Sequence, residues 1–165
     1  MSVVRVFVGV CNGRTCLGTC DSLLMRHLKT NDGRPTLVLA DDHAAVLERI
    51  SRLLIPGYEI LAAVGNGSMA LDAVLRLNPD VAVLDIAMPG LDGLGAAREL
   101  RNSTCRTRIV FLTLYDDNDY IKAALNNGAL GYVLKSCLTS DLIPAIENAL
   151  AGHIFVSAHS EMADS

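Results

Sequence analysis

The chain has 165 residues, of which 51% are hydrophobic and 19% charged, and its formal net charge is −4. This composition supports a buried core and excludes a wholly disordered chain. The acidic balance, with Lys and Arg scattered, argues against a nucleic-acid-binding surface. No apolar run approaches the ~20 residues that a membrane-spanning helix needs, so no membrane association is expected.

Residues 1–35 differ in character from the rest and are predicted to form an N-terminal extension of unassigned structure. They contain Cys11, Cys16 and Cys20, three of the five cysteines in the chain. An odd cysteine count does not fit a secreted disulfide framework. The first apolar stretch is interrupted by Arg5 and is followed by no cleavage site of the signal-peptide type. We therefore expect a cytoplasmic protein.

Three interpretations of this extension remain open. The spacing of Cys11 and Cys16 faintly resembles the start of thioredoxin-like [2Fe–2S] ferredoxins, although such clusters need four thiolates. A redox or metal module on Cys11, Cys16 and Cys20 is the first alternative, and a fused fragment is the second. The third is a translation start at Met25, which would leave a short lead-in to the first strand.

Five short apolar segments after Pro35 are predicted to be strands. In chain order they are Thr36–Ala40, residues 58–64, residues 80–85, Arg108–Thr113 and residues 130–134. Several of these segments are apolar throughout rather than alternating, which is typical of strands that are covered on both faces.

An amphipathic segment follows each strand and is predicted to be a helix. In chain order these helices cover residues 43–54, 68–77, 92–101, 117–127 and 139–151. Ser68 is the expected N-cap of the second helix, and Asn78-Pro79 is expected to end it. Gly128 is expected just past the end of the fourth helix. Pro144 is expected early in the last helix, where its missing N–H costs least.

Strict alternation of strands and helices predicts an α/β fold with a five-stranded, doubly wound parallel sheet. The domain boundaries expected from this pattern are residues 1–35 for the extension, 36–152 for the α/β domain and 153–165 for a C-terminal linker or tail. In such sheets, ligands bind at the carboxyl ends of the strands.

Polar residues stand at four of these strand ends. Asp41 and Asp42 follow the first strand, Asp85 ends the third, Thr113 ends the fourth and Lys135 follows the fifth. Taken singly, each has a plain structural explanation as a helix cap, a turn residue or a surface charge. Together they predict a site on one edge of the sheet, in which a hard divalent cation offsets the repulsion between three carboxylates. The natural inference is a Mg²⁺ site for phosphoryl chemistry.

Four motifs carry a resemblance to a known family. They are LADDH at residues 39–43, VLDIAMPGLDG at 83–93, IVFLT at 109–113 and GALGYVLK at 128–135. In this order they resemble the receiver domains of two-component response regulators, of the LuxR/FixJ-type branch that usually ends in a helix-turn-helix output domain. The resemblance implies a flavodoxin-like fold with strand order 2-1-3-4-5.

The resemblance also implies roles for individual residues. Asp85 would accept a phosphoryl group, and Lys135 and Thr113 would contact its oxygens. Thr113 and Tyr132 would act as switch residues, with Tyr132 swinging inward and changing the face made by helix four, strand five and helix five. The metal ligands would be Asp41, Asp42, Asp85 and the backbone carbonyl of Ala87. The domain would assist its own phosphorylation and dephosphorylation, without being an enzyme in the usual sense.

The implied partners are a sensor histidine kinase or phosphotransfer protein, together with a homodimer partner on activation. No recognition helix follows residue 152, so direct DNA binding by this chain is not expected. Either the protein is a stand-alone receiver, or an output domain has been lost or cut away. The alternative is a stand-alone interaction module on the same fold that phosphorylation does not regulate. A flavodoxin-like nucleotide binder is set aside, because no glycine-rich loop follows the first strand.

Overall fold

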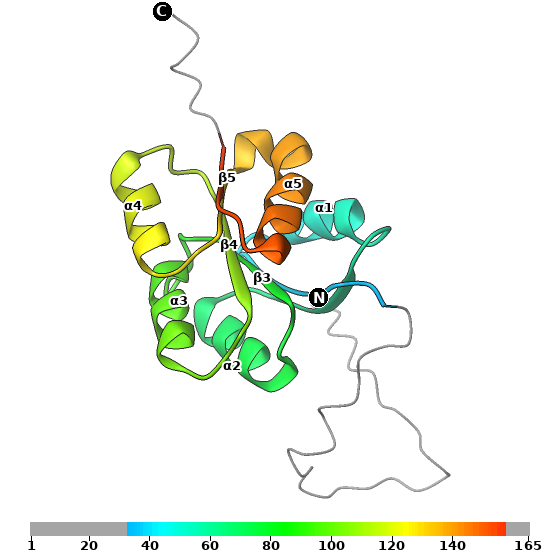
Figure 1. Cartoon of the computed structure of the whole chain (residues 1–165), viewed down its shortest axis with the longest axis horizontal. Helices are drawn as coiled ribbons and strands as arrows, with labels where there is room; N and C mark the ends of the chain where they lie inside the picture. Colours follow the sequence, from blue (N-terminus) through cyan, green and yellow to red (C-terminus); the bar gives the residue numbers. More distant parts are fainter. Residues whose placement is uncertain (1–32, 158–165) are drawn as a thin grey trace, which may run out of the picture. The chain divides into compact units, whose positions relative to one another are not determined.

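Residues 33–157 are described by a computed structural model, and they form a parallel sheet with helices on both faces (Figure 1). The hypotheses about Cys11, Cys16, Cys20 and Met25 lie outside the described residues. So do the extension up to residue 32 and the part of the C-terminal tail that follows residue 157.

All neighbouring strands of the sheet are parallel, in the order β2-β1-β3-β4-β5-β6. The strands are β1 (Thr36–Ala40), β2 (Glu59–Val64), β3 (Val81–Leu84), β4 (Arg108–Thr113), β5 (Gly131–Leu134) and β6 (Phe155–Val156). The predicted order 2-1-3-4-5 is confirmed. The sixth strand was not expected, because two residues are too few to produce a periodic pattern.

The helices alternate with the strands as predicted. They are α1 (Ala44–Leu54), α2 (Gly67–Leu77), α3 (Gly93–Asn102), α4 (Asn118–Asn126) and α5 (Leu138–Ala151), with a short 3₁₀ helix, η2 (Lys135–Cys137), before α5. Most predicted bounds agree to within one residue. No helix within residues 33–157 combines the length and the apolar character that crossing a membrane requires.

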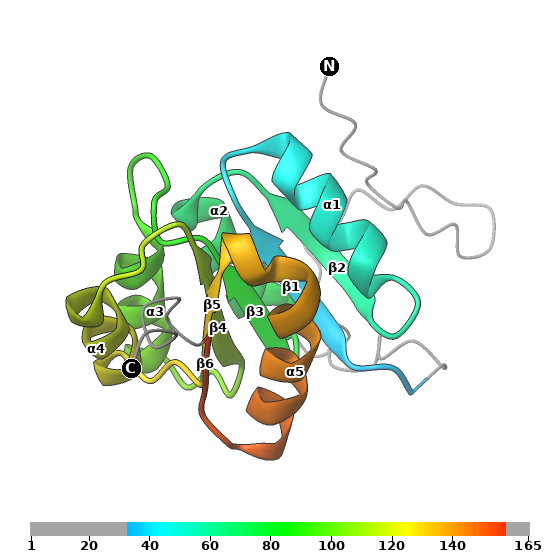
Figure 2. The same cartoon turned by 90° about the horizontal axis from the view of Figure 1, so that it is seen from above.

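The sheet separates two aliphatic clusters, which agrees with a doubly wound fold. Helices α2, α3 and α4 cover one face, and α1 and α5 cover the other (Figures 1 and 2). Strand residues alternate between the clusters: Val38 and Leu84 face α2 and α3, whereas Leu37 and Val83 face α1 and α5. Burial on both faces explains why the strands are continuously apolar.

Two local predictions were wrong. Ser68 does not cap α2; Asn66 does, since its side-chain Oδ1 accepts a hydrogen bond from Met69 N at 2.8 Å. Asn and Ser cap helices equally well, so composition alone did not separate the two positions. Pro144 lies inside α5, beyond its first turn, where its missing N–H is not one of those left free at a helix start. The predicted start at residue 139 already placed it there.

Candidate functional site

The acidic residues meet where β1 and β3 end side by side. Ala40 pairs with Leu84, and Asp85 N donates a hydrogen bond to Ala40 O at 2.8 Å. Asp41 and Asp85 directly follow these paired residues, so the sheet places both carboxylates at one edge. Their side chains are almost completely buried, at 1% and 3% exposure respectively.

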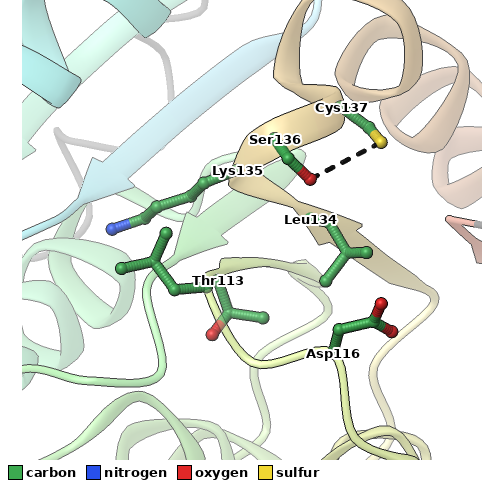
Figure 3. Close-up of a pocket in the computed structure, with 7 residues that line it drawn as sticks. Thr113, Asp116, Leu134, Lys135, Ser136 and Cys137 are labelled. Carbon is green, nitrogen blue, oxygen red and sulfur yellow. Dashed lines mark hydrogen bonds between the residues drawn. The ribbon is translucent and has the colours of Figure 1, made fainter. Parts of the chain in front are cut away.

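Lys135 reaches the same edge from β5, two strands away from β3 in the sheet. Its Nζ lies 2.6 Å from Asp41 Oδ2 and 2.8 Å from Asp85 Oδ2. Figure 3 shows its amine pointing away from Ser136 and Cys137. A long, flexible side chain is needed for this span, and only 10% of it is exposed. One ammonium group therefore bridges two buried carboxylates.

Burial and charge oppose each other in this cluster. Burial raises the pKa of Asp85, and the hydrogen bond and charge of Lys135 offset that effect only in part. Burial acts to lower the pKa of Lys135, but the two carboxylates outweigh it and the pKa is raised. Lys135 is thus held firmly as a cation, whereas the ionised form of Asp85 carries an energetic cost.

The donor atoms suit a hard divalent cation. Asp41, Asp42, His43 and Asp85 each offer one ligand atom, and these atoms lie within 4.8 Å of one another. Asp41 Oδ2 is the only buried side-chain N or O atom between residues 33 and 157 that makes no hydrogen bond. The contact between Asp41 Oδ2 and Lys135 Nζ is an ion pair, but its angles do not meet those of a hydrogen bond. An oxygen with free lone pairs, beside two further carboxylates, fits the oxygen-rich coordination of Mg²⁺.

His43 was missed as a member of this cluster. Its Nδ1 lies 2.8 Å from Asp42 Oδ1, and its backbone N donates to Asp41 Oδ1 at 2.8 Å. The sequence signal was its position directly after the acid pair. That position predicts a helix N-cap, which His43 is. It does not predict whether the imidazole, which is 65% exposed, turns toward the acids.

Ala87, the proposed source of a backbone ligand, lies in the loop after β3. Its N–H donates to Asp85 Oδ1 over a long 3.3 Å. The loop is closed by Gly93, whose N–H donates to Ile86 O at 3.0 Å. A Cβ at Gly93 would lie 2.1 Å from Asp85 O, so this close approach requires glycine.

Thr113 is the last residue of β4, the strand between those that supply Asp85 and Lys135. It is fully buried, and its Oγ1 accepts a hydrogen bond from Tyr115 N at 3.2 Å. With Asp116, Lys135 and Cys137 it lines a pocket between the β4–α4 loop and η2 (Figure 3).

Tyr132 on β5 is fully buried, and its hydroxyl donates a hydrogen bond to Tyr115 O at 2.7 Å. Burial is also the main reason why the pKa of its phenol is raised. The inward position that the sequence analysis linked to phosphorylation is therefore already adopted in this structure. The movement itself stays a prediction.

The family model of the response regulator receiver domain matches residues 37–147. The oxygen regulatory protein NreC of Staphylococcus haemolyticus is 37% identical over 123 residues, which cover 73% of this chain and 57% of NreC. The chain thus spans little more than half the length of the curated relatives it matches.

Two solved structures extend the comparison. The signal receiver domain of NarL from Mycobacterium tuberculosis has a TM-score of 0.70 and 29% identity, over 73% of this chain and 98% of that one. A LuxR-family two-component response regulator from an Aurantimonas species has a TM-score of 0.71 and 32% identity, over 79% of this chain and 93% of that one. Motifs, fold and site geometry agree with these matches, and the chain belongs to the response regulator receiver domain family.

Proposed function

We propose that Asp85 accepts a phosphoryl group from a histidine kinase or phosphotransfer protein, with Mg²⁺ as cofactor. The observation that carries the proposal is the bridge from Lys135 Nζ to Asp85 and Asp41, at 2.8 and 2.6 Å. It supports the proposal because it puts a fixed positive charge beside a buried carboxylate, where phosphoryl oxygens would arrive.

Asp41, Asp42 and Asp85 would hold the cation, together with the Ala87 carbonyl. When bound, Mg²⁺ neutralises charge that develops on phosphoryl oxygens. The orphan oxygen of Asp41 favours this assignment, because an ion there would satisfy a buried acceptor that otherwise makes no hydrogen bond.

In the transfer step, a carboxylate oxygen of Asp85 forms a bond to phosphorus while the phosphorus–nitrogen bond of the donor phosphohistidine breaks. The electron pair of that bond stays on the imidazole, which leaves as the donor's free side chain. Lys135 then moves its charge from the carboxylate toward a phosphoryl oxygen. The chain in this way assists its own modification and, with water as acceptor, its reversal.

Thr113 and Tyr132 would transmit the change. Thr113 Oγ1 would exchange its contact with Tyr115 N for a phosphoryl oxygen, and Tyr132 would stabilise the resulting position of the β4–α4 loop through Tyr115 O. The output is a shifted equilibrium at the face made by α4, β5 and α5, which would also favour a homodimer.

The wider role is also a proposal, because the chain covers 57% of the relative NreC. We infer that it is a cytoplasmic signalling domain, and that any DNA binding belongs to an output domain outside the described residues. A relative from Staphylococcus aureus is described as a DNA-binding response regulator of the LuxR family, which supports this division of labour.

Incubation with Mg²⁺ and acetyl phosphate, followed by intact-mass measurement, tests the proposal. We expect one added phosphoryl group in the wild type, none in Asp85→Asn, and a wild-type level in Asp72→Asn, whose carboxylate pairs with Arg76 on the surface. Modification that persists in Asp85→Asn would refute the acceptor. No modification of the folded wild type would favour the alternative, an interaction module that phosphorylation does not regulate.

A further inference from the structure

The unexpected strand β6 is attached to the strand that carries Tyr132. Gly131 pairs with Phe155 and Tyr132 with Val156. Phe155 N donates to Leu130 O, and Ser157 N donates to Tyr132 O, both at 2.8 Å. The backbone of the proposed switch residue is therefore a direct hydrogen-bond partner of the chain's exit from the domain.

Ser157 makes a second connection, next to Lys135. Its side chain is buried, with 3% exposure; its Oγ accepts a hydrogen bond from Leu134 N at 3.2 Å and donates one to Asp141 Oδ2 at 2.6 Å. Leu134 immediately precedes Lys135, whose amine lies at Asp85. Ser157 thus joins the backbone one residue before Lys135 to helix α5.

Packing adds to these hydrogen bonds. Val156 packs against the cluster that contains Tyr132 and Phe111, whereas Phe155 packs against the cluster on the α5 side of the sheet. Both residues are half-buried. Because β6 has only two residues, its detachment breaks few contacts, and such short edge segments open at a low free energy.

We propose that β6 is a strap that couples the Asp85 site to the end of the described domain at Ser157. The attached strap and the arrangement seen here, with Tyr132 inward and Lys135 engaged, stabilise each other. This inference rests on the proposed function for its physiological trigger. Since coupling between two sites is reciprocal, a phosphoryl group that favours this arrangement tightens the strap, and loss of the strap weakens phosphoryl binding by the same factor.

Hydrogen exchange at single amides tests the first half of the coupling. With Mg²⁺ and beryllofluoride as the probe for a phosphoryl group, the amides of Phe155 and Ser157 should exchange at least ~5-fold more slowly. The amide of Glu59, which donates to Pro35 O at the opposite edge of the sheet, should not change. Unchanged exchange at Phe155 and Ser157, while ¹⁹F NMR shows bound beryllofluoride, would overturn the proposal.

The variant Ser157→Ala tests the second half. It removes both side-chain hydrogen bonds of Ser157, so beryllofluoride affinity should fall; the limit, reached when the strap is fully detached, is the factor of the wild-type protection at Phe155. Ser140→Ala is the matched control, because Ser140 Oγ hydrogen-bonds to the other carboxylate oxygen of Asp141 at 2.6 Å and to Cys137 O at 3.1 Å, and both partners lie outside β5 and β6. Equal affinities for all three proteins, when hydrogen exchange shows the strap of Ser157→Ala to be detached, would contradict the coupling.

A measurement without the probe separates this inference from the proposed function. If folded wild type does not bind beryllofluoride, the proposed function fails, but a double-mutant cycle of Ser157→Ala and Lys135→Met still decides the coupling. We expect the unfolding equilibrium constant of the double variant to differ at least ~5-fold from the product of the single effects. Agreement within about twofold would mean that β6 and Lys135 are independent.

Discussion

At Asp85, the burial that protects the carboxylate from bulk water also makes its negative charge costly. Asp41 is buried at the same edge of the sheet, and among the described residues a single cation, Lys135, contacts both carboxylates. Negative charge therefore exceeds positive charge among these three side chains. This imbalance favours the binding of a divalent cation. It also predicts that removing the acid Asp85 and removing Lys135 change the stability of the metal-free protein in opposite directions.

Asp85→Asn should raise the thermal stability of the metal-free protein at neutral pH, by about 1 kcal/mol. The pKa of Asp85 is raised in the folded state, so the folded protein binds more protons than the unfolded chain between the two pKa values. Stability contributed by this group is lost as the pH rises through that interval. The extra stability of the variant over the wild type should therefore shrink as the pH falls toward the pKa of Asp in an unfolded chain, about 3.9.

Thermal unfolding of both proteins in EDTA, from acidic to neutral pH, measures this difference. Asp72→Asn provides the control, since its carboxylate is 64% exposed and lies on the surface of α2. An Asp85→Asn variant that is less stable than the wild type at neutral pH would mean that Lys135 more than compensates the buried charge.

Lys135→Ala should be destabilising by about 3 kcal/mol at neutral pH, because it leaves two buried carboxylates without a cation. The loss should diminish when Mg²⁺ is added and when the carboxylates are protonated at low pH. Chemical denaturation with and without Mg²⁺ checks both effects. Lys122→Ala should stay within about 0.5 kcal/mol of the wild type, because Lys122 is 73% exposed and its contact with Asp119 spans 3.9 Å.

At the scale of elements, the β3–α3 connection determines the position of Asp85, the proposed acceptor. The side chain of Asp92 caps α3 by accepting from Gly95 N, and Gly93 brings the first turn of the helix against the backbone of Asp85. Gly93, although glycine has low helix propensity, is thus required by the close contact. The element is positioned by backbone sterics more than by helix propensity.

Gly93→Ala should cost about 1–3 kcal/mol, as overpacking does, and should slow phosphorylation by displacing Asp85. A Cβ there would lie 2.1 Å from Asp85 O and 3.0 Å from Ile86 Cα, and backbone atoms cannot rotate away. Gly57→Ala is the control, because its Cβ would meet no atom within 4 Å. Denaturation and acetyl phosphate kinetics on both variants test this; equal behaviour would show that the loop adjusts freely.

At the scale of the whole molecule, the site exists only when the sheet is assembled. Its side chains come from the ends of β1, β3, β4 and β5, and an unfolded chain cannot hold them together. Any ion that binds this arrangement and not the unfolded chain must stabilise the entire fold.

Mg²⁺ should therefore raise the unfolding temperature of the wild type. The expected stabilisation is about 2.7 kcal/mol when free Mg²⁺ is 100-fold above its Kd. The effect should be much smaller in Asp41→Asn and unchanged in Asp72→Asn. Scanning calorimetry at increasing Mg²⁺ concentrations measures the unfolding temperature. An unfolding temperature that does not respond to the ion would contradict the cation site.

Much of the fold was predictable because local patterns carried it. Continuous apolar runs predicted buried parallel strands, and amphipathic runs between them predicted helices on both faces. Asp41, Asp85, Thr113 and Lys135 were identifiable as one candidate set, because the carboxyl ends of parallel strands share an edge. Pattern and motif together were enough for these conclusions.

Other features required the tertiary structure. That Lys135 contacts Asp41 as well as Asp85 depends on strand order and on the reach of a side chain across β4, which no local spacing encodes. The turn of His43 toward the acids, the buried hydroxyl of Tyr132 on Tyr115 O and the pairing of β6 with β5 are likewise contacts between distant segments. The sequence by itself determined which chemical groups stand at the ends of the strands. Only the packed sheet decided which of them touch, because those distances are determined by how the strands and loops pack together.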